Sequence, residues 1–457
     1  MLLNRKAKEV FGIDPVGSDG ALDWIDQCVD IYRGSPCWID EGEHIDTIDF
    51  AKSVCSEIAR LVTLGIGLKV DGSARAEWIQ QILDNKIYYR LREWVEYGCA
   101  YGTIVIKPSA DGVYLYLPSE FDVTHSTDGK IDGIVFYHWK KAAKKWYTRL
   151  EYHRYESNNY LITNECFVGN TKGELKKPVN IEFTPWSGMK EEESLTNIKT
   201  PLFGVFKMPG ANNIDIGSPY GLPAFSEAVQ ELRDLDIAYS RNAKEILDSK
   251  RTVLLDSDTM MAPGKKLSGN LFTALERTRE SLGLPDVVKN VQGDGREMFY
   301  QEINPEINTE MRLKGINYLL SQIGYKVGFS NGYFVFNEST GIQTATGVEA
   351  EQQRTVQFIK DVRDKLENCV RCLVYAISSI ADLYNLAPQG AYEIFFDFGD
   401  ITYNKEEDKA TWRGYVTQGW VPKWMYFVKF EGMTEEDAKA MAAEASSKQP
   451  SLFGAEE

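Results

Sequence analysis

The feature that most constrains the fold is a single, very long amphipathic helix in the last third of the chain. From about Val348 to Leu386, apolar side chains recur every three or four residues without a break. The members of this stripe are Ile359, Val362, Leu366, Cys369, Leu373, Ile377, Ile380 and Tyr384. At 1.5 Å per residue the helix would be about 58 Å long, whereas the usual helix has about 11–12 residues. Pro388 and Gly390 end it.

The segment before this helix is polar and contains no His, Cys or Asp. It reads "FSNGYFVFNESTGIQTATGVEAEQQ", from Phe329 to Gln353. Another helix is predicted ahead of it, at 304–329, where Asn304 can act as the cap and Pro305 suits the first turn. A further helix is predicted within 217–250. The long helices present more apolar stripe than one subunit can cover, so burial against further copies is expected.

The first half of the chain predicts helices followed by a sheet. Helical spacing begins at Asp49, and a second helix is predicted from Glu77 to Tyr97, ending before Gly98. Short β-branched and aromatic runs then extend from Gly102 to about Lys207, separated by turn sequences such as "STDGK". This succession predicts an antiparallel sheet region and the α+β class.

Composition excludes several classes of function. The 457 residues carry a formal net charge of -16, and proteins that grip DNA phosphates tightly usually have a basic excess. Seven scattered cysteines fit a reducing compartment. The N-terminus shows no signal-peptide pattern, and no apolar run approaches the ~18 residues needed to cross a membrane.

Motifs for catalysis, metals and cofactors are weak or absent. "GFSNG", Gly328 to Gly332, fits the nucleophile elbow of hydrolases, which needs a strand before it and a later histidine. Here a helix is predicted before it, and every histidine lies upstream. Ser330 is therefore expected to lie at a helix C-cap, and the chain is predicted not to be an enzyme. "CVRC", Cys369 to Cys372, lacks further zinc ligands. No phosphate-binding or dinucleotide loop is complete, so no cofactor is expected.

Three stretches resemble the portal proteins of tailed bacteriophages, in particular those of Gram-positive siphophages. "GSPYGLPAFSEAVQELRDLDIAYS" (217–240) is similar to the segment that leads into the family's first stem helix. "GFSNGYFVFNESTGIQTATGVEAEQQRTVQFIKDVRD" (328–364) is similar to its tunnel-loop region, with Gly347 in place of an expected Glu. "FGDITYNKEEDKATWRGYVTQGWVPKWMYFVKFEGMTEEDAKA" (398–440) resembles the family's tail.

The resemblance implies a portal fold with a mixed wing domain, long stem and tunnel helices, a small α/β clip and a short α-rich crown. By position, the wing is 1–216, the stem helices are 217–250 and 304–329, the clip is 251–303, the tunnel loop is 330–347, the long helix is 348–386 and the crown and tail are 387–457. The implied channel-loop residues are Asn331, Gly332, Asn337, Gly341, Gln343, Thr344, Thr346 and Gly347. Lys326 and Arg354 are candidates for transient phosphate contact, with helix-face salt bridges as the alternative. Lys265 and Lys266 are the expected clip interface.

The family's function follows as an expectation. It implies a ring, usually of twelve subunits, at one capsid vertex of the virion, assembled in the host cytoplasm. The expected partners are the terminase large subunit, the major capsid and scaffolding proteins, the head–tail adaptor and, transiently, double-stranded DNA in the channel. Two other classes stay open at this point: another structural ring protein of the virion neck, and a hydrolase that uses "GFSNG". No membrane partner is expected.

Overall fold

The computed structural model describes residues 6–40, 45–109, 112–156, 159–249, 252–256, 287–291, 300–303, 309–335, 345–399, 405–418, 420–431 and 433–447. They fall into two compact units, 1–63 with 67–396, and 64–66 with 397–457. The chain combines helices with largely antiparallel sheets, as the predicted α+β class requires.

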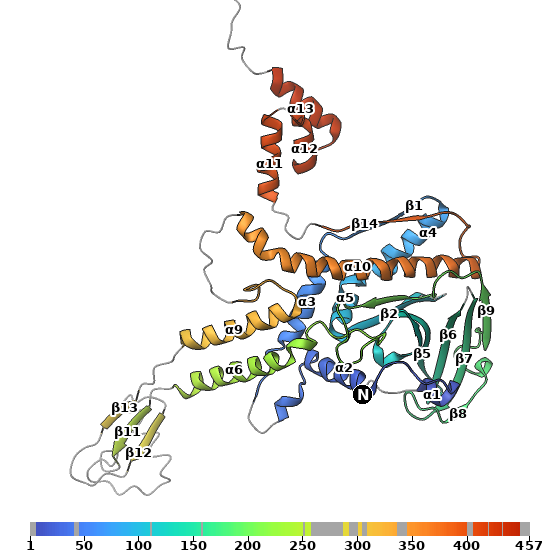
Figure 1. Ribbon diagram of the computed structural model, residues 1–457, viewed down its shortest axis with the longest axis horizontal. Helices are drawn as coiled ribbons and strands as arrows, with labels where there is room; N and C mark the ends of the chain where they lie inside the picture. The colour runs from blue at the N-terminus through green and yellow to red at the C-terminus, as the bar shows by residue number, and fades with distance from the viewer. Residues whose placement is uncertain are drawn as a thin grey trace, which may run out of the picture. The chain divides into compact units, whose positions relative to one another are not determined.

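Helices open the first unit (Figure 1). They are α1 (Lys6–Phe11), α2 (Asp19–Tyr32), α3 (Phe50–Val62), α4 (Ala74–Ile82) and α5 (Leu91–Tyr101). The predicted stripe of α3 is confirmed, because its apolar side chains are buried. Two of these helices, α3 and α5, pack against each other.

The single helix predicted from Glu77 to Tyr97 is wrong. The chain instead forms α4, a π-helical turn (Leu83–Ile87), a 3-10 turn (Tyr88–Arg90) and then α5, which runs through Gly98. Gly98 does not end the helix. Its lack of a side chain instead leaves room for the ring of Phe206 beside α5. A Cβ at this position would lie 2.3 Å from the ring of Phe206.

Two sheets follow, and every pairing between Thr103 and Lys207 is antiparallel, as predicted. The smaller sheet has the order β10-β2-β3 and the larger β4-β5-β6-β7-β8, with β9 paired to β7. The strands are β2 (Thr103–Ser109), β3 (Gly112–Tyr116), β4 (Phe121–Thr127), β5 (Lys130–Ala142), β6 (Lys145–Glu156), β7 (Asn159–Gly169), β8 (Lys177–Pro178), β9 (Glu192–Thr196) and β10 (Gly204–Lys207). Leu150 and Tyr152 of β6 face a core that includes Ala7 of α1.

The long helix α10 spans Ala345–Leu383, 39 residues, against a prediction of 348–386. Its start was predicted too late because first-turn residues need not join the apolar stripe. Its end was predicted too late because Asn385 has a left-handed backbone (φ 50), which closes the helix at its C-terminus.

The helix α10 packs on β10 and β2 of the smaller sheet and on α3. Gly204 of β10 allows the closest approach, since a Cβ there would lie 2.5 Å from the carbonyl oxygen of Cys369. Arg363 points from α10 to the end of α3 and donates to the carbonyls of Leu61 (2.9 Å) and Val62 (3.1 Å). The last carbonyls of a helix lack the usual i+4 amide donor, and here an arginine of another helix donates to two of them.

Arg75 of α4 donates hydrogen bonds to backbone carbonyls at the C-terminal end of α10. Its side chain is 1% exposed and donates to the carbonyls of Ser378 (2.6 Å), Pro388 (2.7 Å) and Ala387 (2.8 Å). It also pairs with Asp382 at 2.6 Å. Beyond this cap, β14 (Glu393–Asp397) pairs with β1 (Gly67–Asp71).

Two helices, α6 (Val229–Asp248) and α9 (Thr309–Val327), lie side by side (Figure 1). Arg312 near the start of α9 pairs with Glu245 near the end of α6, and Lys326 at the end of α9 pairs with Glu231 near the start of α6 at 2.6 Å. The two helices are therefore antiparallel. The first was predicted within 217–250. It begins after a 3-10 turn at Ser226–Ala228, and just before this turn Ala224 N donates to Cys99 O at 2.8 Å.

The chain between α6 and α9 contains a three-stranded sheet in the order β12-β11-β13. Its strands are β11 (Thr252–Asp256), β12 (Val287–Val291) and β13 (Tyr300–Ile303). The pairing of β11 with β12 is parallel and that of β11 with β13 is antiparallel. The cap predicted at Asn304 lies outside the described residues.

The second unit contains three short helices, α11 (Lys405–Thr417), α12 (Lys423–Glu431) and α13 (Glu435–Ser447). Thr434 caps α13, with its hydroxyl oxygen accepting from Asp437 N at 3.2 Å. Trp412 of α11 packs edge-on against Phe430 of α12. The second unit comprises 64–66 and 397–457, so residues 387–396, which the resemblance groups with the crown, fall in the first unit.

Candidate functional site

The first residues of the predicted channel loop form a packed turn after α9. Gly328 (φ 119) closes the helix, with its amide bonded to Gly324 O at 3.1 Å. Phe329 is fully buried and contacts Phe334 and Phe358, and Phe334 meets Phe50 of α3 edge-on. Residues 328–335 are thereby fixed between α9, α10 and α3.

Ser330 belongs to this packed turn. Its amide donates to Thr355 Oγ1 at 2.8 Å, and its hydroxyl lies 3.0 Å from the same oxygen. The residue is 6% exposed. A helix precedes it, and turn residues follow it, which is not the strand–turn–helix arrangement of a nucleophile elbow.

The predicted channel-loop residues separate into three groups. Asn331 and Gly332 lie on the turn and are exposed. Thr346 and Gly347 are in the first turn of α10, so their assignment to a loop was wrong. Asn337, Gly341, Gln343 and Thr344 lie outside the described residues, as do Lys265 and Lys266 of the predicted clip interface.

Both candidate phosphate-contact residues have partners within the chain. Lys326 Nζ pairs with Glu231 at 2.6 Å and donates to Glu227 O at 3.1 Å. The Arg354 guanidinium lies 3.9 Å from the centre of the Tyr325 ring and donates to Tyr325 O at 2.9 Å. These contacts correspond to the salt-bridge alternative for Lys326 and to a cation–π contact for Arg354.

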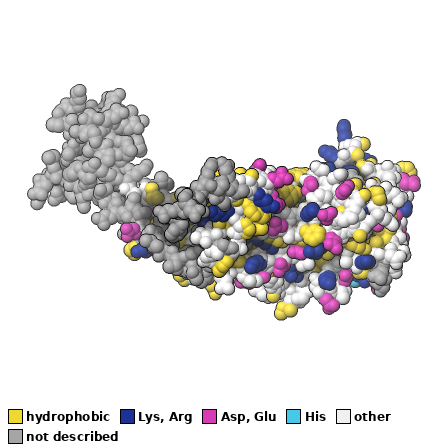
Figure 2. Space-filling view, turned by 90° about the horizontal axis from the view of Figure 1, so that it is seen from above, with side chains coloured by type: hydrophobic (Ala, Val, Ile, Leu, Met, Phe, Trp, Pro, Cys, Tyr) yellow, Lys and Arg dark blue, Asp and Glu magenta, His cyan; other side chains and the backbone are white. Residues whose placement is uncertain are grey.

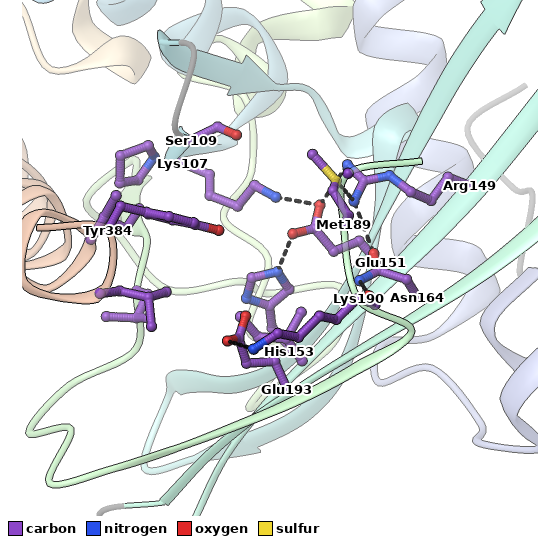
Figure 3. Close-up of a pocket in the computed structure, with 16 residues that line it drawn as sticks. Lys107, Ser109, Arg149, Glu151, His153, Asn164, Met189, Lys190, Glu193 and Tyr384 are labelled. Carbon is purple, nitrogen blue, oxygen red and sulfur yellow. Dashed lines mark hydrogen bonds and ion pairs between the residues drawn. The ribbon is translucent and has the colours of Figure 1, made fainter. Parts of the chain in front are cut away.

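A second site was not predicted. It is a cavity of about 310 Å³ between the two sheets and the end of α10. Figure 3 shows Lys107, Glu151, His153 and Tyr384 pointing toward its centre, with Arg149 beyond Glu151. The apolar part of the wall comes chiefly from Ile162, Leu202, Ile380 and Leu383. Lys190, Glu193 and Tyr384 lie at the exposed rim.

Glu151 is the centre of a buried charged network in this cavity. Its carboxylate accepts from Lys107 Nζ at 2.5 Å and lies 3.1 Å from Arg149 Nη2. The two imidazoles bind the same carboxylate, His138 Nε2 at 2.7 Å and His153 Nε2 at 2.8 Å. Because Lys107 belongs to β2 and the other four residues to β5 and β6, the network joins the two sheets.

Aromatic rings and amides complete the surroundings of the two cations. Lys107 Nζ lies 4.7 Å from the centre of the Phe136 ring, and the Arg149 guanidinium 5.4 Å from the Trp186 ring. Arg149 Nη1 also donates to Asn164 Oδ1 at 2.8 Å. Both cations are therefore fixed in position and shielded from water.

Burial sets the protonation of the histidines. It lowers the pKa of His138 to about 4, although Glu151 opposes this shift. Burial likewise lowers the pKa of His153. A neutral His153 satisfies both of its contacts, since Nε2 can donate to Glu151 while Nδ1 accepts from Tyr160 Oη at 2.7 Å.

The pKa of Glu151 moves in the direction set by its partners. Burial alone would raise it, but Lys107 and Arg149 outweigh burial and hold it well below the usual range. At neutral pH the network thus contains two cations, one carboxylate and two neutral histidines.

Acid is expected to destabilise the first unit through these histidines. Their pKa in the folded state lies below the unfolded value of about 6.5, so the unfolded chain binds protons first as the pH falls. The stabilisation is complete above that pH and decreases below it, with a limiting slope of about 1.4 kcal/mol per pH unit for each histidine. Urea unfolding between pH 7.5 and 5 at constant ionic strength measures this slope. His138→Gln should reduce it, and an unchanged slope in that variant would contradict the assignment.

The sequence contained a signal for this network that was not recognised. Arg149, Glu151 and His153 alternate along β6 and so point to one face, which resembles an ordinary solvated face. The residues between them face the core described above, and only an unusual run of polar types suggested that the second face is covered as well. His138, on the preceding strand β5, and Lys107, in another sheet, could not be joined to it from spacing alone.

The surface charge is mixed rather than segregated. On the face seen in Figure 2, acidic and basic side chains are interspersed among hydrophobic ones. The net charge of -16 is therefore not gathered into one acidic region on that face. In the described part of the chain, no cluster of His, Cys, Asp and Glu could hold a metal ion, and no helix is apolar enough over a sufficient length to cross a membrane.

Comparisons with known proteins give distant similarities. No protein-family model matches the chain, and no curated protein does. One similar solved chain belongs to the "Virion of native gene transfer agent (GTA) particle", with 12% identity, a TM-score of 0.43, and coverage of 93% of this chain and 98% of that chain. Another belongs to the "Neck of native GTA particle computed with C12 symmetry", with 12% identity, a TM-score of 0.43, and coverage of 94% and 99%. Similarity this low carries no argument about function.

Proposed function

We propose that this chain is the subunit of a portal ring of a tailed-phage type particle. The observation that carries the proposal is the antiparallel pair α6 and α9, which flanks a small three-stranded sheet in the chain and is followed by a packed turn and the 39-residue α10. This is the order of stem helix, clip, stem helix, tunnel loop and long helix that the sequence resemblance implies.

The proposed ring has twelve subunits at one vertex of the virion capsid and forms after synthesis in the host cytoplasm. It provides the passage for double-stranded DNA, docks the terminase large subunit during packaging and later joins the head–tail adaptor. The major capsid and scaffolding proteins are its other proposed partners. The proposed channel loop lies within 330–347, ahead of the helical part of α10, and 251–303, including Lys265 and Lys266, is the proposed clip.

Exposed apolar side chains on the helix pair support a subunit interface. They are Tyr239 and Ile246 of α6 and Met311, Tyr318 and Tyr325 of α9, between 41% and 73% exposed. Large apolar groups gathered on neighbouring helices are typical of surfaces that a partner covers. A second copy of the chain in a closed ring would bury them.

Imaging of the purified full chain tests this function. Negative-stain images should show rings with an open centre, and native mass spectrometry should give one closed assembly of about twelve copies. Tyr318→Asp should prevent ring formation and leave a folded monomer, because it charges the exposed face of α9. Tyr89→Asp is the matched control, since Tyr89 is 70% exposed and lies outside the helix pair. A monomer at every concentration, or rings unaffected by Tyr318→Asp, would argue against the proposal.

A further inference from the structure

Two segments of the larger sheet are rich in lysine. The hairpin between β5 and β6 reads "WKKAAKKWY" from Trp139 to Tyr147, with four lysines and no acidic residue. The loop and short strand after β7 read "NTKGELKKPVN" from Asn170 to Asn180, with three lysines and one acidic residue, Glu174. In a chain with a net charge of -16, these two segments are locally basic.

The register of the sheet brings the two segments into one cluster, here called the lysine ridge. Lys140 of β5 is opposite Tyr147 of β6. Val168 of β7 follows in the same row and is opposite Lys177 of β8. Because neighbouring strands are ~4.8 Å apart, this row is about 14 Å wide. The members of the ridge are all exposed: Lys140, Lys141, Lys144, Lys145, Lys172, Lys176 and Lys177.

The one carboxylate within the two segments is used locally. Glu174 accepts from the backbone amides of Asn170 at 2.6 Å and Thr171 at 3.1 Å. These bonds, and to a smaller extent the nearby Lys176, lower the pKa of Glu174. Within the described part of the chain, no carboxylate forms an ion pair with any lysine of the ridge. The ridge therefore presents its ammonium groups to solvent.

Lysine side chains leave the ridge on both faces of the sheet. Lys140 and Lys141 are consecutive on β5, so they point to opposite faces. The ammonium group of Lys140 lies 5.5 Å from the centre of the Trp186 ring. On the other face, that of Lys141 lies 5.9 Å from the centre of the Trp146 ring. The positive charge thus surrounds the end of the sheet instead of covering one flat side.

This arrangement favours a polyanion that presents two rows of charge. Duplex DNA has a row of phosphates on each side of a groove, and lysines on both faces of a ridge can reach both rows. A flat acidic surface of another protein would contact one face only. Because duplex DNA carries one negative charge per ~1.7 Å of its axis, about 14 Å of duplex carries about eight charges. The ridge supplies seven lysines for them.

Single-stranded nucleic acid and base-specific contacts fit the ridge less well. Proteins that bind single strands stack bases on accessible aromatic rings. Here Trp139 and Trp146 are half-buried, and Lys172 lies 4.6 Å from the centre of the Trp139 ring. The two segments contain no arginine, whose paired hydrogen bonds to guanine are the commonest base-specific contact. Contacts of lysine with phosphates carry no sequence information.

We propose that the lysine ridge binds the phosphate backbones of double-stranded DNA without regard to sequence. The choice of DNA among polyanions rests on the proposed portal function, but the residues of the ridge are distinct from the proposed channel loop and clip. Because the whole chain has a net charge of -16, the binding is local and weak, and added salt weakens it further.

Fluorescence anisotropy of a short labelled duplex of arbitrary sequence, titrated with the full chain, tests the ridge. If four phosphates are contacted, the logarithm of the affinity should fall against the logarithm of the salt concentration with a slope of about -3.6, or about twelvefold for each doubling of salt. Replacing the four hairpin lysines by glutamine should weaken binding about tenfold or more and make the slope less steep. This hairpin variant is Lys140→Gln, Lys141→Gln, Lys144→Gln and Lys145→Gln.

A matched control makes the same change in net charge at exposed lysines elsewhere in the chain. It consists of Lys52→Gln, Lys86→Gln, Lys360→Gln and Lys365→Gln. The control should keep the affinity and the salt slope of the parent chain. Equal losses in the two variants, or no loss in the hairpin variant, would overturn the proposal. If the hairpin variant does not fold, Lys172→Gln with Lys177→Gln tests the ridge from its other segment and should also weaken binding.

Competitors identify the kind of polyanion. Unlabelled duplex should displace the probe more effectively than single-stranded DNA or polyglutamate at equal charge. Equal or stronger displacement by polyglutamate would assign the ridge to an acidic protein surface, and equal displacement by single strands would contradict the two rows of phosphates. Rings with an open centre that bind no duplex would refute the DNA site and leave the proposed function intact.

Discussion

Arg75→Met is expected to lower the free energy of unfolding of the first unit by about 3 kcal/mol, since hydrogen bonds to charged groups contribute ~1.5–3 kcal/mol each without full additivity. The arginine donates hydrogen bonds to one carbonyl near the end of α10 and to two carbonyls just after it, and it also pairs with Asp382. Methionine can fill much of the same space but donates no hydrogen bond. The loss should therefore come from unpaired carbonyls rather than from a cavity.

Urea unfolding combined with hydrogen exchange measures this effect. The exchange of amides near the end of α10 should accelerate more than that of α3, because the cap acts locally. Arg371→Met on the same helix is the matched control, since Arg371 is 47% exposed and pairs with Glu367 of the previous turn and with the Phe396 ring. Its expected cost is below about 1 kcal/mol. Equal losses in the two variants would contradict the role assigned to Arg75.

Glu151→Gln is expected to be still more damaging, with a loss of about 3–5 kcal/mol, the usual cost of removing one partner from a buried ion pair. The substitution leaves Lys107 and Arg149 buried with no carboxylate between them. Both sheets should loosen, since the network joins β2 to β6. Urea unfolding followed by far-UV circular dichroism measures the loss.

A second substitution distinguishes charge from packing in this network. Lys107→Met in the Glu151→Gln background removes one of the two cations that the Glu151 carboxylate bound, so the double variant should be more stable than the single one. Glu193→Gln is the control for loss of a carboxylate at the rim, and it should cost less than about 1 kcal/mol because Glu193 pairs with an exposed lysine. A double variant less stable than Glu151→Gln alone would indicate that packing by Lys107 dominates.

The spacing of apolar residues along the sequence predicted those helices and strands that bury one face and expose the other. The stripe from Ile359 to Ile380 predicted α10 to within three residues at each end, because an amphipathic helix must repeat its apolar residues with the period of the helix. The antiparallel region from Thr103 to Lys207 was predicted by its turn chemistry for the same reason. Local chemistry sufficed where near neighbours decide the conformation.

Features that depend on distant residues could not be predicted. The continuation of α5 through Gly98 depends on Phe206, which lies in another strand. The charged cavity depends on Lys107, Glu151 and Tyr384, which come from three separate parts of the chain. Lys326 was a candidate for phosphate contact because the sequence does not reveal its partner Glu231, which lies 95 residues earlier on another helix. Spacing along a sequence carries no information about such encounters.

The contact of Arg363 with α3 divides α10 into two arms of similar length. Arg363, which holds the end of α3, lies near the middle of the helix, 18 residues after Ala345 and 20 before Leu383. An α-helix of 39 residues is stiff and about 58 Å long, so its two arms cannot tilt independently of this fulcrum. We expect a displacement of the arm that begins at Ala345 to move the other arm, where Leu383 and the adjoining Tyr384 line the charged cavity. Because α10 also packs on β10, β2 and α3 and is capped by Arg75, we expect a displacement of its N-terminal arm to reach the cavity through these contacts as well.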